Sequence, residues 1–86
     1  MARYSITVKR SATRELRRIP KRDLRRVAKR IRSLATEPRP CGCEKLSAQE
    51  RYRVRQGDYR VVYSVDDAER VVCVVKVGHR REVYRS

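Results

Sequence analysis

Residues 51–65 read RYRVRQGDYRVVYSV, and this stretch is the strongest structural signal in the chain. At its centre, Gly57-Asp58 forms a two-residue loop with glycine first, which is typical of a tight turn between antiparallel strands. The residues on either side are rich in Val and Tyr, which favour strands. We therefore expect a β-hairpin with strands over residues 51–56 and 59–65.

The two-residue loop also sets the register of this hairpin, because each residue before the loop must pair with one after it. The expected pairs are Gln56 with Tyr59, Arg55 with Arg60, Val54 with Val61, Arg53 with Val62, and Tyr52 with Tyr63. Directly opposite residues share a face of the sheet. One face should therefore carry most of the Val and Tyr side chains and pack on helices. The other should carry Arg53, Arg55 and Arg60, and we call it the arginine face.

Three arginines on one face need an explanation, because like charges directly opposite each other destabilise a sheet. An anion bound between them would remove the repulsion. The alternative is a solvated side of a half-buried sheet, but that arrangement predicts charges of both signs or Ser and Thr. We therefore favour an anion-binding face.

The first half of the chain predicts a strand and two helices. A strand is expected over residues 3–8. A helix then begins at Ser11, a suitable N-cap, with Glu15 early enough to favour its start. Pro20 suits the first turn of a second helix. The apolar residues of that helix recur every three or four positions until Pro38 ends it.

The second half completes an α+β fold with the element order β-α-α-β-β-β in a single domain, residues 1–86. Residues 38–43 should form a loop, and residues 70–77 a last strand that Gly78 closes. Short connections make the last three strands an antiparallel meander. We expect an antiparallel sheet with both helices packed on one face, since their apolar stripes have no other surface to cover.

The composition indicates a polyanionic partner. The 86 residues include 24 Lys and Arg against 10 Asp and Glu, a net charge of +14. Metal enzymes built on carboxylates and acidic signalling modules do not fit this balance. No apolar run exceeds five residues, and the first ten residues lack the apolar stretch of a signal peptide, so we expect a cytoplasmic protein that spans no membrane. RNA and DNA are the expected partners, with an anionic membrane surface as the lesser alternative.

The three cysteines do not predict a metal site. Zinc sites take four ligands, usually with C-x₂₋₄-C pairs, whereas this chain offers Cys41 and Cys43 as C-x-C, the distant Cys73, and one histidine. An odd cysteine count without a secretion signal also argues against a disulfide framework. We expect free thiols in a loop, and Cys73 as a small residue in or near the core.

Basic residues are concentrated in the two expected helices. Residues 9–32 include 12 basic residues and two acids, a net charge of +10, and most of these lie off the apolar stripes. The alternatives are a solvated face that keeps the protein soluble and a surface that binds phosphates. A small domain needs a net charge of only about 2–8 for solubility, so we favour the second. The candidate RNA-binding residues here are Arg22, Arg25, Arg26 and Lys29.

Residues 77–84 read VGHRREVY, and Gly78 should turn the chain so that the only histidine comes within reach of the arginine face. Together with YRVRQGDYRVVY at residues 52–63, and after two basic helices, this segment resembles the RelE/ParE superfamily of bacterial and archaeal toxins, specifically its RelE branch. The likeness covers nearly the full length. It implies a fold similar to microbial ribonucleases and cleavage of mRNA in the ribosomal A site. It also implies restraint by a cognate acidic, RelB-like antitoxin, through which operator DNA can be bound.

The resemblance also implies roles for particular residues. By position it gives catalytic roles to Arg55, Arg60, His79, Arg80 and Tyr84, and RNA-binding roles to Arg53 and Arg81. Arg60 matches the arginine at the scissile phosphate and Arg80 a second one beside it. Tyr84 matches a tyrosine that stacks on a base or helps to activate the nucleophile. Relatives often have Lys where this chain has Arg55, and arginine is a poor proton acceptor with a pKa above about 12. The general base is therefore left open between His79 and Tyr84.

The implied reaction is attack of a ribose 2′-OH on the adjacent phosphate, which leaves a 2′,3′-cyclic phosphate and a 5′-OH. It needs no metal and no cofactor, and we expect none. A single histidine excludes a two-histidine acid–base pair, so the free protein should be a feeble ribonuclease that needs the ribosome to hold its substrate in line. Two alternatives stay open: a ParE-like inhibitor of DNA gyrase that cleaves no RNA, and a non-catalytic nucleic-acid-binding module.

Overall fold

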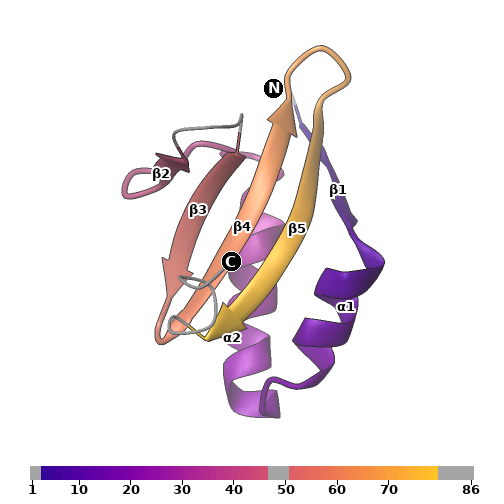
Figure 1. Cartoon of the computed structure of the whole chain (residues 1–86). Coiled ribbons are helices and arrows are strands. Elements are labelled where there is room, and N and C mark those ends of the chain that lie inside the picture. Colours follow the sequence, from indigo (N-terminus) through magenta and orange to yellow (C-terminus); the bar gives the residue numbers. More distant parts are fainter. Residues whose placement is uncertain (1–2, 47–50, 80–86) are drawn as a thin grey trace.

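The computed structural model describes residues 3–46 and 51–79, in which five strands form one sheet and two helices pack against it (Figure 1). The elements are β1 (Ser5–Val8), α1 (Arg10–Arg17), α2 (Lys21–Ser33), β2 (Glu44–Leu46), β3 (Arg51–Gln56), β4 (Tyr59–Asp66) and β5 (Val71–His79). The sheet order is β1-β5-β4-β3-β2. The element order agrees with the predicted one, with β2 as an additional short strand.

The hairpin of β3 and β4 has the predicted register at every pair from Gln56 opposite Tyr59 to Tyr52 opposite Tyr63. Gly57 has a positive φ of 60°, whereas Asp58 does not, which is the backbone pattern of a turn with glycine first. A side chain at position 57 would be strained in this conformation, so the turn needs its glycine. The turn is the local reason why the two strands meet in this register.

The strands β3, β4 and β5 form the predicted antiparallel meander. The sheet is not wholly antiparallel, however, because β1 runs parallel to β5, with Ile6 beside Val72 and Val8 beside Val74. A parallel pair requires a long crossover connection. Here the two helices and the rest of the sheet lie between the two strands in the sequence. β2 closes the opposite edge, where Glu44 lies beside Arg53.

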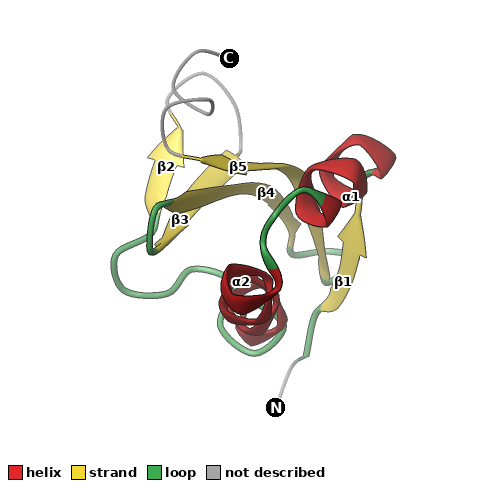
Figure 2. Cartoon of the chain, turned by 90° about the horizontal axis from the view of Figure 1, so that it is seen from below, coloured by secondary structure: helices red, strands yellow, loops and turns green. Residues whose placement is uncertain are grey.

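The core lies between the two helices and one face of the sheet, as predicted. Figure 2 shows α2 beneath the sheet and α1 beside β1 and β5. The buried apolar residues of both helices and of the sheet form one cluster: Ala12, Ile19, Val27, Ile31, Leu34, Val54, Val61, Tyr63, Val65, Val72, Val74 and Val77. Both predicted helical stripes therefore face the same core. Within the described residues, neither helix is long and apolar enough to cross a membrane.

The pairing of β4 with β5 contains a register shift between Val62 and Tyr63. Tyr63 lies opposite Val74, but Val62 lies opposite Lys76, so Val75 is an extra residue on β5. Such a bulge changes which residues of a strand face the core. Val74 and Val77 are both fully buried in the core, and Lys76 shares the opposite face with Val62.

Three details of the predicted elements are wrong. Ser11 is not an N-cap, because α1 begins at Arg10 with Lys9 as its N-cap and no side-chain cap. Glu15 does not lie in the first turn of α1; its carboxylate instead accepts a hydrogen bond from the backbone N–H of Val77 at 2.9 Å. Gly78 does not close the last strand, which continues to His79. The backbone of residue 78 pairs with β4, and this pairing extends the strand.

Candidate functional site

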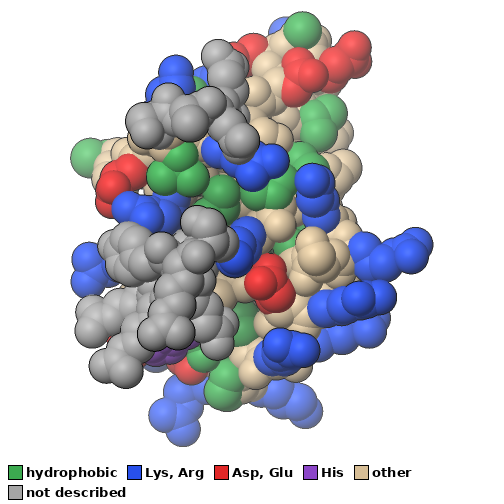
Figure 3. Space-filling view, viewed as in Figure 1, with side chains coloured by type: hydrophobic (Ala, Val, Ile, Leu, Met, Phe, Trp, Pro, Cys, Tyr) green, Lys and Arg blue, Asp and Glu red, His purple; other side chains and the backbone are tan. Residues whose placement is uncertain are grey.

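The arginine face exists as predicted, on the side of the sheet away from the helices. Arg55 of β3 lies directly opposite Arg60 of β4, and Arg53 lies opposite Val62. In the space-filling view of Figure 3, basic side chains predominate on the described surface of this side, whereas acidic side chains gather at the β4–β5 turn. The face therefore offers a sheet-supported set of cations.

Arg60 is almost wholly enclosed. Only 6% of Arg60 is exposed, while Arg55, directly opposite it, is exposed. Arg60 lies in the central strand β4, where Gly78 of β5 is paired directly opposite it. A charged group held in such a site interacts more strongly with an anion than one in open water.

Arg53 has an acidic neighbour on the edge strand. Its Nη2 donates to Glu44 Oε2 at 2.8 Å, across the pair that joins β2 to β3. The side chain of Arg53 is 14% exposed and that of Glu44 is 67% exposed. This contact orients Arg53 and balances part of its charge.

Lys76 is a further cation on the arginine face that the sequence analysis missed. Lys76 is on β5 and lies opposite Val62 of β4. Val62 is two residues after Arg60 on β4, so both side chains are on the same face of the sheet. Strict alternation from Val72 and Val74 would have placed Lys76 in the core. The bulge at Val75 prevents this, and the lysine itself was the available signal, since an unpaired lysine is almost never buried in a core.

His79 lies on the other side of the sheet from the position predicted for it. It pairs with Tyr59, and the two rings meet edge to face with centroids 5.9 Å apart. Both line a cleft of about 160 Å³ with Glu15 and Arg18 of the first helical segment. The expectation that His79 reaches the arginine face assumed that the strand ended at Gly78. Because β5 continues, the alternation turns His79 toward the helix side.

The remaining predicted residues divide into two groups. Arg80, Arg81 and Tyr84 lie outside the described residues. The helical residues Arg22, Arg25, Arg26 and Lys29 are all exposed on α2, as predicted. The structure brings Arg26 and Lys29 together in a cleft with Gln56 of the hairpin.

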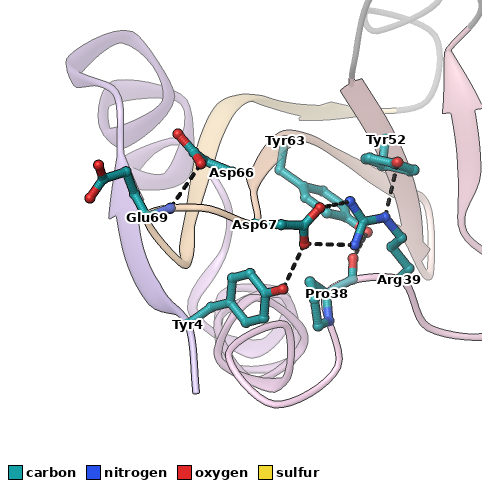
Figure 4. A network of polar contacts seen from close by, with 8 residues as sticks. All are labelled: Tyr4, Pro38, Arg39, Tyr52, Tyr63, Asp66, Asp67 and Glu69. Carbon is teal, nitrogen blue, oxygen red and sulfur yellow. Dashed lines mark hydrogen bonds and ion pairs between the residues drawn. The ribbon is translucent and has the colours of Figure 1, made fainter. Parts of the chain in front are cut away.

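A polar cluster joins the residue before β1, the 38–43 loop and the β4–β5 turn (Figure 4). Arg39 makes a bidentate contact with Asp67, at 3.1 Å from Nη1 to Oδ1 and 2.8 Å from Nη2 to Oδ2. The hydroxyl of Tyr4 donates to the same carboxylate at 2.6 Å, and Arg39 Nε donates to the hydroxyl of Tyr52 at 3.0 Å. The sequence gives no local signal for this cluster, because its members are far apart in the chain.

The contacts of this cluster perturb the pKa values of its members. The hydrogen bonds from Arg39 and then from Tyr4 lower the pKa of Asp67 to about 2. The hydrogen bond to Asp67 raises the pKa of Tyr4. Burial raises the pKa of Tyr63, whose hydroxyl donates to the carbonyl of Pro38 at 2.7 Å. The shifts of Asp67 and Tyr4 come from their hydrogen bonds and that of Tyr63 from burial, so we assign the cluster to holding the loop and the turn in place.

The comparisons with known proteins agree with this fold. A family model described as "ParE toxin of type II toxin-antitoxin system, parDE" matches residues 6–84. The chain belongs to the RelE/ParE superfamily of type II toxin–antitoxin toxins.

Two named relatives with similar sequences are both toxins of the RelE branch. Toxin RelG of Mycobacterium tuberculosis is 30% identical over 84 residues, which cover 95% of this chain and 97% of RelG. Toxin RelE of the same organism is 29% identical, covering 95% of this chain and 87% of that toxin.

Solved structures with a similar fold are also RelE toxins. The RelBE2 toxin–antitoxin complex of M. tuberculosis matches with a TM-score of 0.81 and 28% identity, over 91% of this chain and 99% of the matched one. The archaeal RelE–RelB complex of Pyrococcus horikoshii matches with a TM-score of 0.81 and 31% identity, over 93% and 97% of the two chains. The predicted RelE-like fold is confirmed. The chain is a RelE-family toxin of the type II toxin–antitoxin class.

Proposed function

We propose that this toxin cleaves mRNA on the ribosome by attack of a ribose 2′-OH on the adjacent phosphate. The observation that carries the proposal is the arginine face: Arg55 and Arg60 lie directly opposite each other, with Lys76 on the neighbouring strand. Cations in this arrangement repel one another unless an anion lies among them. A phosphate whose charge increases in the transition state is the anion that gains most from them.

Enclosure strengthens the proposed interaction. A guanidinium and a phosphate about 4 Å apart attract each other by about 1 kcal/mol in water and by about 4 kcal/mol at the effective dielectric of a protein surface. Arg60 is almost wholly enclosed, while Arg55 is open to solvent. We assign Arg60 to the scissile phosphate and Arg55 to the neighbouring oxygen, with Arg80 as a third phosphate contact by family resemblance.

Proton transfer is assigned to Lys76 and Tyr84 in this proposal. Arginine cannot exchange a proton at neutral pH, whereas an amine and a phenol can. Lys76 lies on the arginine face, opposite Val62, and Tyr84 matches the family tyrosine by its position in the sequence. His79 is not assigned to proton transfer, because it pairs with Tyr59 on the helix side of the sheet, away from the arginine face.

The need for the ribosome follows from two separate basic surfaces. The arginine face lies on one side of the sheet, and α2, with Arg22, Arg25, Arg26 and Lys29, packs on the other. An RNA strand bound on the arginine face would therefore not contact the basic surface of α2 as well. We propose that the mRNA lies on the arginine face and that ribosomal RNA contacts the helices, which would orient the substrate for in-line attack.

The proposed partner is a cognate antitoxin of the RelB type. The toxins of the M. tuberculosis and P. horikoshii complexes resemble this chain, and each complex contains an antitoxin. An acidic segment over the arginine face would neutralise the cations and block the substrate. Expression of the toxin alone in bacteria should arrest growth, and co-expression with the cognate antitoxin should relieve the arrest.

The test uses purified toxin and ribosomes carrying a defined mRNA. Cleavage in the A site, with a 2′,3′-cyclic phosphate and a 5′-OH at the new ends, is the expected result. Naked mRNA should be cut far more slowly. Intact mRNA on programmed ribosomes, at a toxin concentration that arrests translation, would reject the proposal.

Inhibition of DNA gyrase is the second candidate function, favoured by the description of the matching family model as a ParE toxin. A gyrase inhibitor would block supercoiling of relaxed plasmid by purified gyrase and leave ribosome-bound mRNA intact. The two assays, run with one toxin preparation, separate the candidates.

A further inference from the structure

Two different elements lie along the outer edge of β5, the edge that faces away from β4. β1 pairs with β5 as far as Val74, and past that point α1 lies beside the strand (Figure 1). The N–H of Ser5 donates to the carbonyl of Arg70 at 2.8 Å, and that of Lys9 donates to the carbonyl of Val74 at 2.9 Å. Because backbone groups alternate between the two edges of a strand, the even-numbered residues from 70 to 74 face β1.

Past the bulge, the odd-numbered residue Val77 faces this same outer edge. Its backbone N–H donates to Oε1 of Glu15 on α1 at 2.9 Å. Without Val75 as an extra residue, strict alternation would turn the N–H of Val77 toward β4 and away from Glu15. The hydrogen bond to Glu15 is therefore specific to the bulged register of β5.

The same extra residue decides on which face of the sheet Lys76 lies. In the bulged register, Val77 is fully buried in the core and Lys76 lies opposite Val62 on the arginine face. In a register without the bulge, Lys76 and Val77 would exchange faces. A group that binds the N–H of Val77 at the outer edge thus stabilises the arrangement in which the lysine joins the arginines.

The carboxylate of Glu15 is committed to this backbone contact. Glu15 is half-buried and, with Val77, lines the cleft of about 160 Å³ beside α1. Arg18 lines the same cleft, but no ion pair among the described residues includes Glu15. Without this carboxylate, the N–H of Val77 would be a buried donor with no acceptor, which costs free energy. The strand could relieve that cost only by slipping one residue or by opening to water, and both would displace Lys76.

We propose that Glu15 is a positioning residue for the arginine face: by accepting the N–H of Val77, it holds the bulge of β5 and keeps Lys76 opposite Val62. Glu15 lies on the helix side of the sheet and acts through the backbone of β5, without touching the substrate. The assignment rests on the proposed function only for its effect on cleavage. Its structural part concerns the register of β5 and is independent of the reaction.

The first test follows the pairing of β5 by NMR in the free toxin. Cross-strand nuclear Overhauser effects should join Val62 to Lys76 and Tyr63 to Val74, as in the structure. Glu15→Ala should lose the first contact and keep the second, since only the segment past the bulge loses its support. Glu15→Gln keeps an acceptor oxygen and should keep both contacts.

The second test is single-turnover cleavage on programmed ribosomes. Glu15→Ala should slow cleavage at saturating toxin about tenfold, as Lys76→Met does, with little change in the toxin concentration that gives half the maximal rate. The double variant should be no slower than Lys76→Met alone, because a residue that acts through the lysine adds nothing once the lysine is gone. Glu37→Ala, an equal charge change at an exposed position, should keep the unsubstituted rate.

Two results would overturn the proposal: a Val62–Lys76 contact that persists in folded Glu15→Ala, or rate losses for Glu15→Ala and Lys76→Met that multiply in the double variant. If Glu15→Ala does not fold, Glu15→Asp decides, because it keeps the charge but is one methylene shorter. It should lose the Val62–Lys76 contact, and retention of that contact would reject the assigned role. A toxin that cleaves no RNA would fail the proposed function, while the NMR comparison would still decide whether Glu15 holds the bulge.

Discussion

Arg55 of β3 and Arg60 of β4 are paired directly across the hairpin and share the face of the sheet that the helices leave open. The Arg55 side chain is exposed, whereas only 6% of Arg60 is exposed. Like charges in this position oppose folding. The proposed phosphate between the two guanidinium groups would offset this repulsion.

The first prediction concerns the exposed member of the pair. Arg55→Gln should leave stability unchanged or raise it by up to about 0.5 kcal/mol, because it relieves repulsion at an exposed position. Cleavage on programmed ribosomes should fall about 10²-fold, since one transition-state contact is lost. Urea unfolding and single-turnover cleavage measure the two effects. A destabilised protein with normal cleavage would show that Arg55 has a structural role only.

The second prediction concerns Lys76, which the bulge at Val75 places on the arginine face. Lys76→Met should slow cleavage at least tenfold, whereas Lys21→Met, at the exposed start of α2, should have little effect. Lys76→Arg separates two roles, because arginine keeps the charge but cannot transfer a proton. If the lysine transfers a proton, Lys76→Arg will be as slow as Lys76→Met. Full activity of Lys76→Met would remove this residue from the site.

The third prediction concerns Glu15, whose carboxylate accepts the backbone N–H of Val77 beside the bulge. Glu15→Ala leaves that donor without its acceptor and should lower the free energy of unfolding by about 1–3 kcal/mol. Glu15→Gln keeps an acceptor oxygen and should cost less. Glu37→Ala, an exposed acid at the end of the second helical segment, is the matched control for lost charge. Equal melting temperatures for the two alanine variants would contradict the assigned role.

The fourth prediction concerns pH. The pKa of Asp67 is about 2 in the folded protein, below the value of about 3.9 expected in the unfolded chain. The carboxylate therefore contributes stability that is fully present above about pH 4 and is lost as the pH falls toward 2. Asp67→Asn should be less stable than the unsubstituted protein at pH 6, and the difference should shrink between pH 4 and 2. A difference that stays constant over this range would show that ionisation of Asp67 is not its source.

Local signals in the sequence were sufficient to predict the hairpin and the helices. Gly57 with Asp58 fixes a register that runs unchanged to Tyr52 and Tyr63, because a two-residue turn permits few alternatives. The helical stripes also faced the core as their spacing indicated. The short strand Glu44–Leu46 was missed because three residues show no alternation; its contacts with β3, including the Glu44–Arg53 ion pair, become visible only in the fold.

The site was predicted less completely than the fold, for two physical reasons. One extra residue at Val75 shifts the alternation of β5, and this shift brings Lys76 to the arginine face. Continuation of β5 through Gly78 turns His79 to the other side of the sheet, where it pairs with Tyr59. Bulges and strand ends depend on pairing with distant residues, which a reading along the chain does not include.

The most direct measurement of the central claim is single-turnover cleavage on programmed ribosomes by Arg60→Met beside the unsubstituted toxin. Because Arg60 is enclosed, methionine is preferable to alanine: it fills the space of the side-chain stem and should leave a cooperative thermal melt. We predict a folded variant that cleaves at least 10²-fold more slowly, while the unsubstituted toxin yields 2′,3′-cyclic phosphate ends. Cleavage by folded Arg60→Met at the unsubstituted rate would contradict the account, since the scissile phosphate would then lie elsewhere.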